Sequence, residues 1–279
     1  MKLAISNIAW PHEDSPAVLG LLRSEGVGWI EVAPSRIWPE PVDASLEERA
    51  AYVRSIGEYG IRVISLHSLL YTRPDLGIFQ GRETDRKTIR YLAQLAELAS
   101  DLGAKWMVFG SPKNRRKGSL GFAGACDAAA RVFGPAGDAA ADLGVTILIE
   151  PLTRAEADFV NTTDEGIGLV KAVGSRGFAL HLDAKSVAEE PGGKEAIFRR
   201  ALPLLRHFHV NDPCLAPLGS EARYHEELGG ALRRSGYDGH VSIEMRTFPD
   251  HRGVIAESLA LARRFYIGPG RALSGNRGM

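Results

Sequence analysis

Residues 145–151 read VTILIEP, an apolar run rich in β-branched side chains that stops at a carboxylate and a proline. A strand buried on both faces of a parallel sheet has this composition, because neither of its faces meets water. The pattern therefore predicts a buried strand that presents Glu150 at its C-terminal end.

Three later stretches repeat this design, each with an acidic or imidazole side chain at or near its end. They are 178–183 (FALHLD), 205–210 (LRHFHV) and 240–244 (HVSIE). Parallel strands of one sheet end at the same edge, so Asp183, His209 and Glu244 are expected to converge there with the carboxylate of the first stretch. Four such side chains on successive strands predict a functional site.

Short apolar runs alternate with longer amphipathic runs along the whole chain, which is typical of repeated βα units. Eight cycles can be counted, with strands expected at 2–6, 28–32, 62–66, 106–109, 146–150, 179–183, 207–210 and 242–244. The clearest helical patterns lie at 16–25, 46–59, 84–102 and 124–143. Eight units without a compositional break favour an α/β fold, a single closed (β/α)₈ barrel, over an open doubly wound sheet. In such a barrel the functional residues lie at the C-terminal ends of the strands.

The barrel is expected to span residues 1–267 as one domain, because no linker-like stretch interrupts the pattern. The tail at 268–279 loses the periodicity and is expected to be flexible. Several helices are expected to stop at a glycine in the left-handed conformation, at Gly60, Gly103 and Gly144.

The 279 residues include 34 basic and 34 acidic side chains, which give a formal net charge of zero. This balance provides no overall attraction to nucleic acid or to an anionic membrane. No apolar run approaches the roughly 20 residues that cross a bilayer, and the N-terminus leads directly into a strand. A soluble, cytoplasmic protein is expected. Cys126 and Cys214 are expected to be reduced thiols, because they are distant and lack metal-type spacing.

The histidines of these strands should occupy different depths of the barrel. Residues two apart on a strand point the same way, so His207 is expected one layer below His209, and His181 one layer below Asp183. His67, at the end of the third expected strand, either lines the substrate pocket or packs in the core.

The converging side chains have the character of a metal site. Two Glu, one Asp and one His suit Mn²⁺ or Mg²⁺ better than a structural Zn²⁺ site. Without a cation, three carboxylates in a low-dielectric mouth would repel one another and raise their pKa values. The sequence therefore predicts one divalent ion, Mn²⁺ or Mg²⁺, with Co²⁺ or Zn²⁺ as alternatives.

Five motifs carry a resemblance to a known family: 150–156 (EPLTRAE), 159–162 (FVNT), 181–183 (HLD), 207–212 (HFHVND) and 242–244 (SIE). They resemble the xylose-isomerase-like barrels, the sugar phosphate isomerase/epimerase group that includes D-tagatose 3-epimerase, hydroxypyruvate isomerase, inosose dehydratase and endonuclease IV. The resemblance implies that one divalent cation is held by Glu150, Asp183, His209 and Glu244. It also implies that Glu150 and Glu244 form the acid/base pair, that Glu156 contacts a terminal hydroxyl of a carbohydrate substrate, and that the protein is a homodimer.

The chain departs from the family pattern at residues that recognise the sugar. Ser186 stands where the epimerases usually have a histidine, and Thr153 where they usually have an asparagine. The arginine expected soon after His209 is missing from 213–217 (PCLAP). The metal set is thus retained while the sugar-recognition set is changed.

Such a site supports proton abstraction beside a carbonyl, with a metal ion stabilising the charge that develops. Two bases on opposite faces would give epimerisation, and one base moving a proton between adjacent carbons would give isomerisation. A dehydratase of the inosose or dehydroshikimate type begins with the same step and is an alternative, as is a non-catalytic sugar-binding barrel. An endonuclease is disfavoured, because it needs about three metal ions and attraction to DNA.

The loop at 110–118 reads GSPKNRRKG and places four cations in five positions at the expected catalytic rim. Lys113 and Arg115 in this loop, together with Lys185 and Arg246 two residues beyond ligand candidates, could bind a phosphate or carboxylate group. The alternative is a solvated loop. The functional interpretation predicts a substrate that carries an anionic group.

Overall fold

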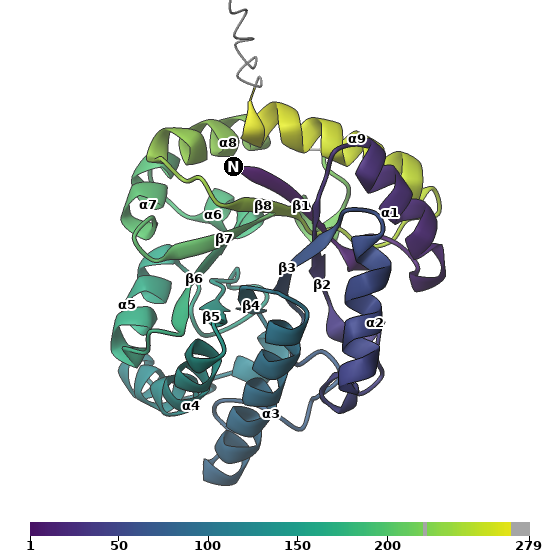
Figure 1. Cartoon of the computed structure of the whole chain (residues 1–279). Coiled ribbons are helices and arrows are strands. Elements are labelled where there is room, and N and C mark those ends of the chain that lie inside the picture. Colours follow the sequence, from purple (N-terminus) through teal and green to yellow (C-terminus); the bar gives the residue numbers. More distant parts are fainter. Residues whose placement is uncertain (220–221, 269–279) are drawn as a thin grey trace, which may run out of the picture.

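The computed structural model describes residues 1–219 and 222–268. Within these ranges eight parallel strands close into a barrel in the order β1 to β8, which confirms the predicted (β/α)₈ barrel (Figure 1). The strands are β1 (Lys2–Ser6), β2 (Trp29–Val32), β3 (Arg62–Leu66), β4 (Trp106–Phe109), β5 (Thr146–Ile149), β6 (Phe178–Asp183), β7 (Leu205–Val210) and β8 (His240–Ile243). The barrel closes where β8 pairs with β1, with Ile243 opposite Ile5.

Helices surround the strands on the outside (Figure 1). In the described residues they are α1 (Ser15–Ser24), α2 (Leu46–Gly57), α3 (Arg82–Asp101), α4 (Phe122–Asp142), α5 (Thr163–Val173), α6 (Ala184–Glu189), α7 (Lys194–Ala201), α8 (Ala222–Ser235) and α9 (His251–Ala262). The predicted glycine stops are confirmed, since Gly60, Gly103 and Gly144 have φ values of 74°, 76° and 72°. None of the described helices is both long and apolar enough to cross a membrane.

Side chains along each strand alternate between the helix layer and the barrel interior. On β5, Ile147 and Ile149 pack in the main hydrophobic core with the helices, so Leu148 faces the interior. Leu148 belongs instead to a small separate apolar cluster with Val108 and Ala179. The interior beside β2, β3, β7 and β8 is polar, and its buried side chains include Glu31, Ser65, His207 and Ser242. The polar half of the interior leads up to the predicted site.

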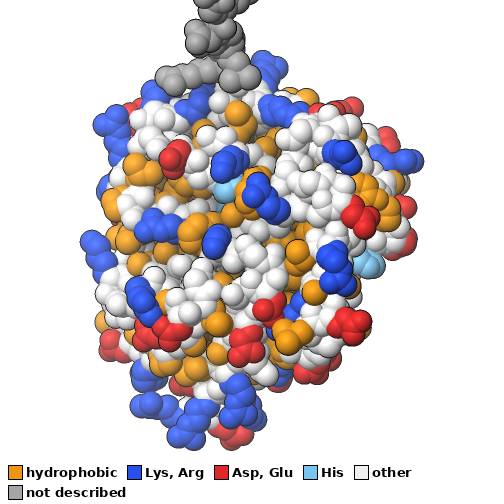
Figure 2. All heavy atoms as spheres, viewed as in Figure 1, with side chains coloured by type: hydrophobic (Ala, Val, Ile, Leu, Met, Phe, Trp, Pro, Cys, Tyr) orange, Lys and Arg blue, Asp and Glu red, His pale blue; other side chains and the backbone are white. Residues whose placement is uncertain are grey.

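The surface seen in Figure 2 carries Lys and Arg side chains interspersed with Asp and Glu, in agreement with the formal net charge of zero. Apart from Gly268, the tail predicted at 268–279 lies outside the described residues.

Candidate metal centre and active site

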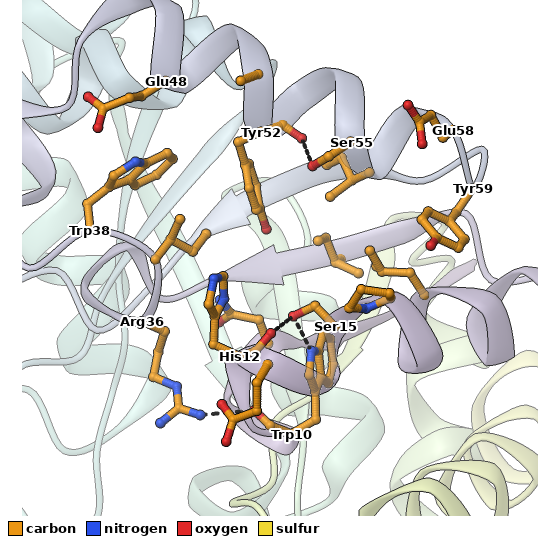
Figure 3. A pocket seen from close by; sticks show the side chains of 18 residues that line it. Trp10, His12, Ser15, Arg36, Trp38, Glu48, Tyr52, Ser55, Glu58 and Tyr59 are labelled. Atoms are coloured by element: carbon orange, nitrogen blue, oxygen red, sulfur yellow. Dashed lines mark hydrogen bonds between the residues drawn. The ribbon is translucent and has the colours of Figure 1, made fainter.

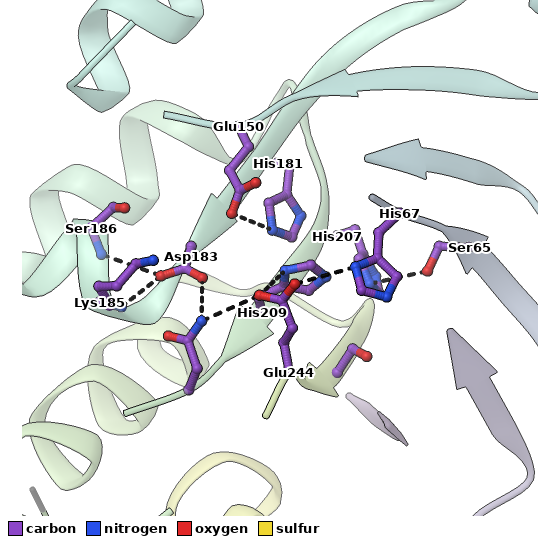
Figure 4. A network of polar contacts seen from close by, with 12 residues as sticks. Ser65, His67, Glu150, His181, Asp183, Lys185, Ser186, His207, His209 and Glu244 are labelled. Carbon is purple, nitrogen blue, oxygen red and sulfur yellow. Dashed lines mark hydrogen bonds and ion pairs between the residues drawn. The ribbon is translucent and has the colours of Figure 1, made fainter. Parts of the chain in front are cut away.

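The four predicted ligands come together at the C-terminal ends of β5 to β8 (Figure 4). Asp183, His209 and Glu244 each offer a ligand atom, and these atoms lie within 4.8 Å of one another. The same holds for Glu150, His181 and His209. His209 belongs to both groups and links them, and each group has a spacing that could hold a metal ion.

The layering predicted for the histidines is confirmed by the pairing of β6 with β7. Asp183 lies opposite His209, and His181 lies opposite His207, one step further from the mouth. The Nε2 atom of His181 is 3.8 Å from Oε1 of Glu150, so this deeper histidine lies next to one of the predicted ligands.

Hydrogen bonds fix the carboxylate of Asp183. Its Oδ1 accepts from the backbone N–H groups of Lys185 at 2.9 Å and Ser186 at 3.3 Å, which makes Asp183 the N-cap of α6. Its Oδ2 accepts from Nδ2 of Asn211 at 2.6 Å. The same Asn211 amide lies 3.4 Å from Oε2 of Glu244 and so holds two like-charged groups side by side.

His209 shows how a metal ion would fit. Its Nε2 lies 2.7 Å from Oε2 of Glu31. Its buried Nδ1 has no hydrogen bond and lies 3.4 Å from Oε2 of Glu244. An unpaired imidazole nitrogen among carboxylate oxygens is a donor set that a divalent cation satisfies.

The pKa values of the cluster agree with this interpretation. Burial raises the pKa of Glu150 to about 8, with the charges of Asp183 and Glu244 acting in the same direction. Burial also raises the pKa of Asp183. Burial would raise the pKa of Glu244 too, but the imidazoles of His209 and His67 outweigh it and hold that pKa well below its usual value. A bound cation would relieve the repulsion that the first two carboxylates experience.

The backbone next to Glu150 leaves room for its carboxylate only because residue 110 is glycine. A Cβ atom at Gly110 would lie 2.4 Å from Oε2 of Glu150. The first residue after β4 thus forms one wall of the candidate site.

A cavity of about 200 Å³ opens above the cluster. It is lined by Glu150, His209 and Glu244, and also by three predicted substrate-binding residues, His67, Glu156 and Lys185. His67 lies in the pocket wall, with Nδ1 3.2 Å from Oε1 of Glu244 and Nε2 2.7 Å from Oγ of Ser6. Lys185 Nζ is 2.7 Å from Oε1 of Glu156, so these two residues form an ion pair at the cavity wall.

The predicted anion clamp does not form. Arg115 is fully buried, and its Nη1 and Nη2 donate to the main-chain carbonyls of Glu150 at 2.6 Å and Val160 at 3.4 Å. Lys113 is exposed and does not line the cavity. Arg246 is also exposed and lies over the ring of Phe248 at 5.1 Å. The prediction for Arg115 was wrong, because the loop turns this side chain into the core. The roles of Lys113 and Arg246 in binding an anion stay predictions.

Arg115 has a structural role that mutation can measure. Arg115→Ala is expected to lower the free energy of unfolding by about 2–4 kcal/mol, because it removes the side-chain donor to the main-chain carbonyl of Glu150 and leaves an empty volume. Its exposed neighbour gives the matched control, since Arg116→Ala should change the free energy by no more than about 0.5 kcal/mol. Urea denaturation measures both. Equally small effects would contradict the buried role of Arg115.

Sequence reasoning missed Glu31, which lies on β2 and is completely buried. Its carboxylate accepts hydrogen bonds from Oγ of Ser65 at 2.8 Å and Oγ of Ser242 at 2.9 Å, in addition to its contact with His209. The signal was present in the stretch WIEV, where one acid interrupts a short apolar strand. A charge on a strand buried on both faces needs a partner.

A second cavity, of about 660 Å³, lies between α1 and α2 outside the barrel wall (Figure 3). Aromatic side chains line much of it, including Trp10, Trp38, Tyr52 and Tyr59. Among the residues that the structure describes, no residue of this cavity belongs to a cluster that could hold a metal ion. The smaller cavity over β5 to β8 is therefore the candidate active site.

Known proteins similar to this chain include sugar epimerases. The chain is 37% identical over 107 residues to a D-psicose 3-epimerase of Agrobacterium fabrum, which covers 38% of this chain and 37% of that protein. It is 27% identical over 111 residues to a ketose 3-epimerase of Arthrobacter globiformis, covering 40% and 38%. Each match thus spans well under half of the curated relative.

The fold is shared over a greater length. The crystal structure of a D-psicose 3-epimerase in the presence of D-fructose superposes with a TM-score of 0.80 at 22% identity, covering 96% of this chain and 100% of that chain. The family profile described as xylose isomerase-like TIM barrel matches residues 19–265, which is most of the chain. The chain therefore belongs to the xylose isomerase-like TIM barrel family.

Proposed function

We propose that the chain is a divalent-metal-dependent ketose 3-epimerase with Glu150 and Glu244 as its acid/base groups. The placement of these two carboxylates carries the proposal. Glu150 reaches the cavity from the end of β5 and Glu244 from the end of β8, on either side of Asp183 and His209 (Figure 4). Inversion at one carbon requires two proton carriers on opposite sides of the bound sugar, and the origin of the two carboxylates on β5 and β8 supports that role for them.

The similarity to curated 3-epimerases supports epimerisation over the other reactions that such a site allows. Both relatives are named for inversion at carbon 3 of a ketose. The departures at Ser186 and Thr153 affect the residues that would recognise the sugar, not the carboxylates that would carry the proton. The proposed reaction class therefore rests on the retained part of the site.

Asp183, His209, Glu150 and Glu244 are the residues proposed to hold the ion, with Mn²⁺ or Mg²⁺ favoured by the oxygen-rich set. When bound, the ion would bind neighbouring oxygens of the ketose and stabilise the negative charge that develops as the proton leaves. The unpaired Nδ1 of His209 and the clustered carboxylates support this assignment.

The protein groups would move the proton. One of the two glutamates would remove the proton from C3 on one face of the ketose, and the other would deliver a proton to the opposite face. His67 Nδ1 at 3.2 Å and Asn211 Nδ2 at 3.4 Å orient Glu244. The main-chain carbonyl of Glu150 is held by Arg115. The carboxylate of Glu244 is thus oriented directly, whereas for Glu150 it is the main chain that is held in place.

The cavity favours a small, neutral sugar. Its volume of about 200 Å³ and its polar lining suit a monosaccharide. The loop cations that suggested an anionic substrate lie elsewhere, and the one lysine of the lining is paired with Glu156. Lys185 and Glu156 together would donate to and accept from sugar hydroxyls.

Proton exchange with solvent tests the proposal directly. The protein is stripped of metal with a chelator, reloaded with Mn²⁺, and incubated in D₂O with D-fructose, D-psicose and pairs of ketopentoses. NMR should detect interconversion of the 3-epimers with deuterium at C3. The chelated sample should be inactive, and Mn²⁺ should restore it.

Other outcomes would replace the proposal. A product that absorbs as a conjugated enone would identify a dehydratase. Conversion of a ketose to an aldose with deuterium at C2 of the aldose would identify an isomerase. No stoichiometric Mn²⁺ binding and no exchange with any ketose would leave a non-catalytic barrel.

A further inference from the structure

A buried polar cluster lies beneath the candidate metal site, around Glu31. The carboxylate extends from β2 across the interior and meets His209 of β7, with Nε2 at 2.7 Å from Oε2. It also accepts from the hydroxyls of Ser65 on β3 and Ser242 on β8. These side chains are all at most 1% exposed, so water cannot replace any of the contacts.

Such a carboxylate is costly to bury unless donors satisfy it. Three donors surround Glu31, and Nε2 of His207 lies 3.5 Å from its Oε1. Its two oxygens accept from two serine hydroxyls and face the imidazole nitrogens of His209 and His207, which is the arrangement of a carboxylate that acts only as an acceptor.

The spacing of Glu31, His207 and His209 would also allow a second metal ion. The hydrogen bonds argue against one. Both oxygens of Glu31 already accept from serine hydroxyls, and Oε2 is also in contact with His209. A carboxylate saturated by protein donors holds a neighbouring side chain in place instead.

The side chain held in place is His209. An imidazole has two nitrogens, and the hydrogen bond made by one decides what the other can bind. With Nε2 donating to Glu31, Nδ1 is the nitrogen left to face an ion; it is buried, makes no hydrogen bond, and lies 3.4 Å from Oε2 of Glu244. We propose that Glu31 is a positioning residue for the metal centre, which fixes the ring and tautomer of His209 so that Nδ1 points at the ion. The proposal rests on the proposed function only in taking His209 as a metal ligand.

Two variants separate the hydrogen bond from the charge. Glu31→Met removes both with little change of length, and the Kd for Mn²⁺ is expected to rise 10- to 100-fold. Glu31→Gln keeps one acceptor oxygen but loses the charge, and a rise of about tenfold is expected. Ser65→Ala is the matched control, because it removes one donor to Glu31 and leaves the contact with His209 intact. Its Kd is expected to stay within about threefold of the wild type.

The hydrogen bond itself can be observed without metal or substrate. In metal-free protein labelled with ¹⁵N-histidine, NMR should show a downfield Nε2–H proton of His209, as expected for a donor to a carboxylate. The signal should be lost in Glu31→Met and retained, further upfield, in Glu31→Gln. A general loss of stability would not remove this signal from a folded variant, so it distinguishes positioning from a structural role.

The outcomes decide between the two proposals. Wild-type Mn²⁺ affinity in Glu31→Met, with the His209 signal unchanged, would overturn the role of Glu31. If Glu31→Met does not fold, wild-type Mn²⁺ affinity in Glu31→Gln would overturn the role of Glu31 as well. Mn²⁺ binding that depends on Glu31 in a protein that epimerises no ketose would support this inference and remove the proposed function.

Discussion

Glu150→Gln and Glu244→Gln are each expected to lower the rate of ketose interconversion by about 10²- to 10⁴-fold, because each removes one of the two proton carriers. Glutamine retains an oxygen, so a metal ligand is weakened but still present, and the assays are run at saturating Mn²⁺. The rate of the double variant should be only slightly lower than that of the slower single variant, since the two groups act as a unit.

The isotope pattern should separate proton transfer from a simple loss of metal. A variant with one remaining carboxylate can still remove the proton on its own face and return it to the same face. Each single variant should therefore incorporate deuterium at C3 of one epimer only. The two variants should label different epimers. Glu257→Gln, an exposed glutamate of α9, is the control and should behave as wild type. Exchange of both epimers by either single variant would contradict the two-base arrangement.

Gly110→Ala is expected to damage the site with little effect on the fold. The added Cβ would lie 2.4 Å from Oε2 of Glu150, so the carboxylate must move by roughly 1 Å to reach an ordinary contact distance. A displacement of that size in a reacting group costs about 10²-fold in rate. The Kd for Mn²⁺ should also rise, because Glu150 is a proposed ligand.

The control for this change is Gly124→Ala in α4, where an added Cβ meets nothing within 4 Å. It should leave activity unchanged and add up to about 1 kcal/mol of stability. Gly110→Ala should unfold at nearly the wild-type urea concentration, since the only close contacts are with the Glu150 side chain. Wild-type kcat in Gly110→Ala would show that the carboxylate can shift without consequence.

The barrel could be predicted from the sequence because each unit repeats the same local pattern. The strands β1, β3 and β4 have the predicted bounds, and the predicted helices end within two residues of the observed ones. The convergence of Asp183, His209 and Glu244 followed from one rule, that parallel strands end at the same edge. Alternation along β6 and β7 then placed the deeper histidines correctly.

The direction of side chains on irregular segments could not be predicted. The basic loop offered four cations with no periodicity to orient them, and tertiary contacts turned Arg115 toward the carbonyls of Glu150 and Val160. Glu31 was missed for a different reason. Its partner His209 is 178 residues away and lies on the far side of the closed seam between β1 and β8, so no local pattern connects them.

The contacts of Glu31 also affect the order of events during folding. Glu31 and Ser242 are 211 residues apart, and they meet only when β8 has paired with β1. In a partly folded chain that lacks this seam, the contacts that surround Glu31 are incomplete, and His209 is not fully oriented. An ion that binds only after the last strand has docked would slow unfolding without accelerating folding. Metal uptake in a stopped-flow refolding experiment would then report the closing of the barrel.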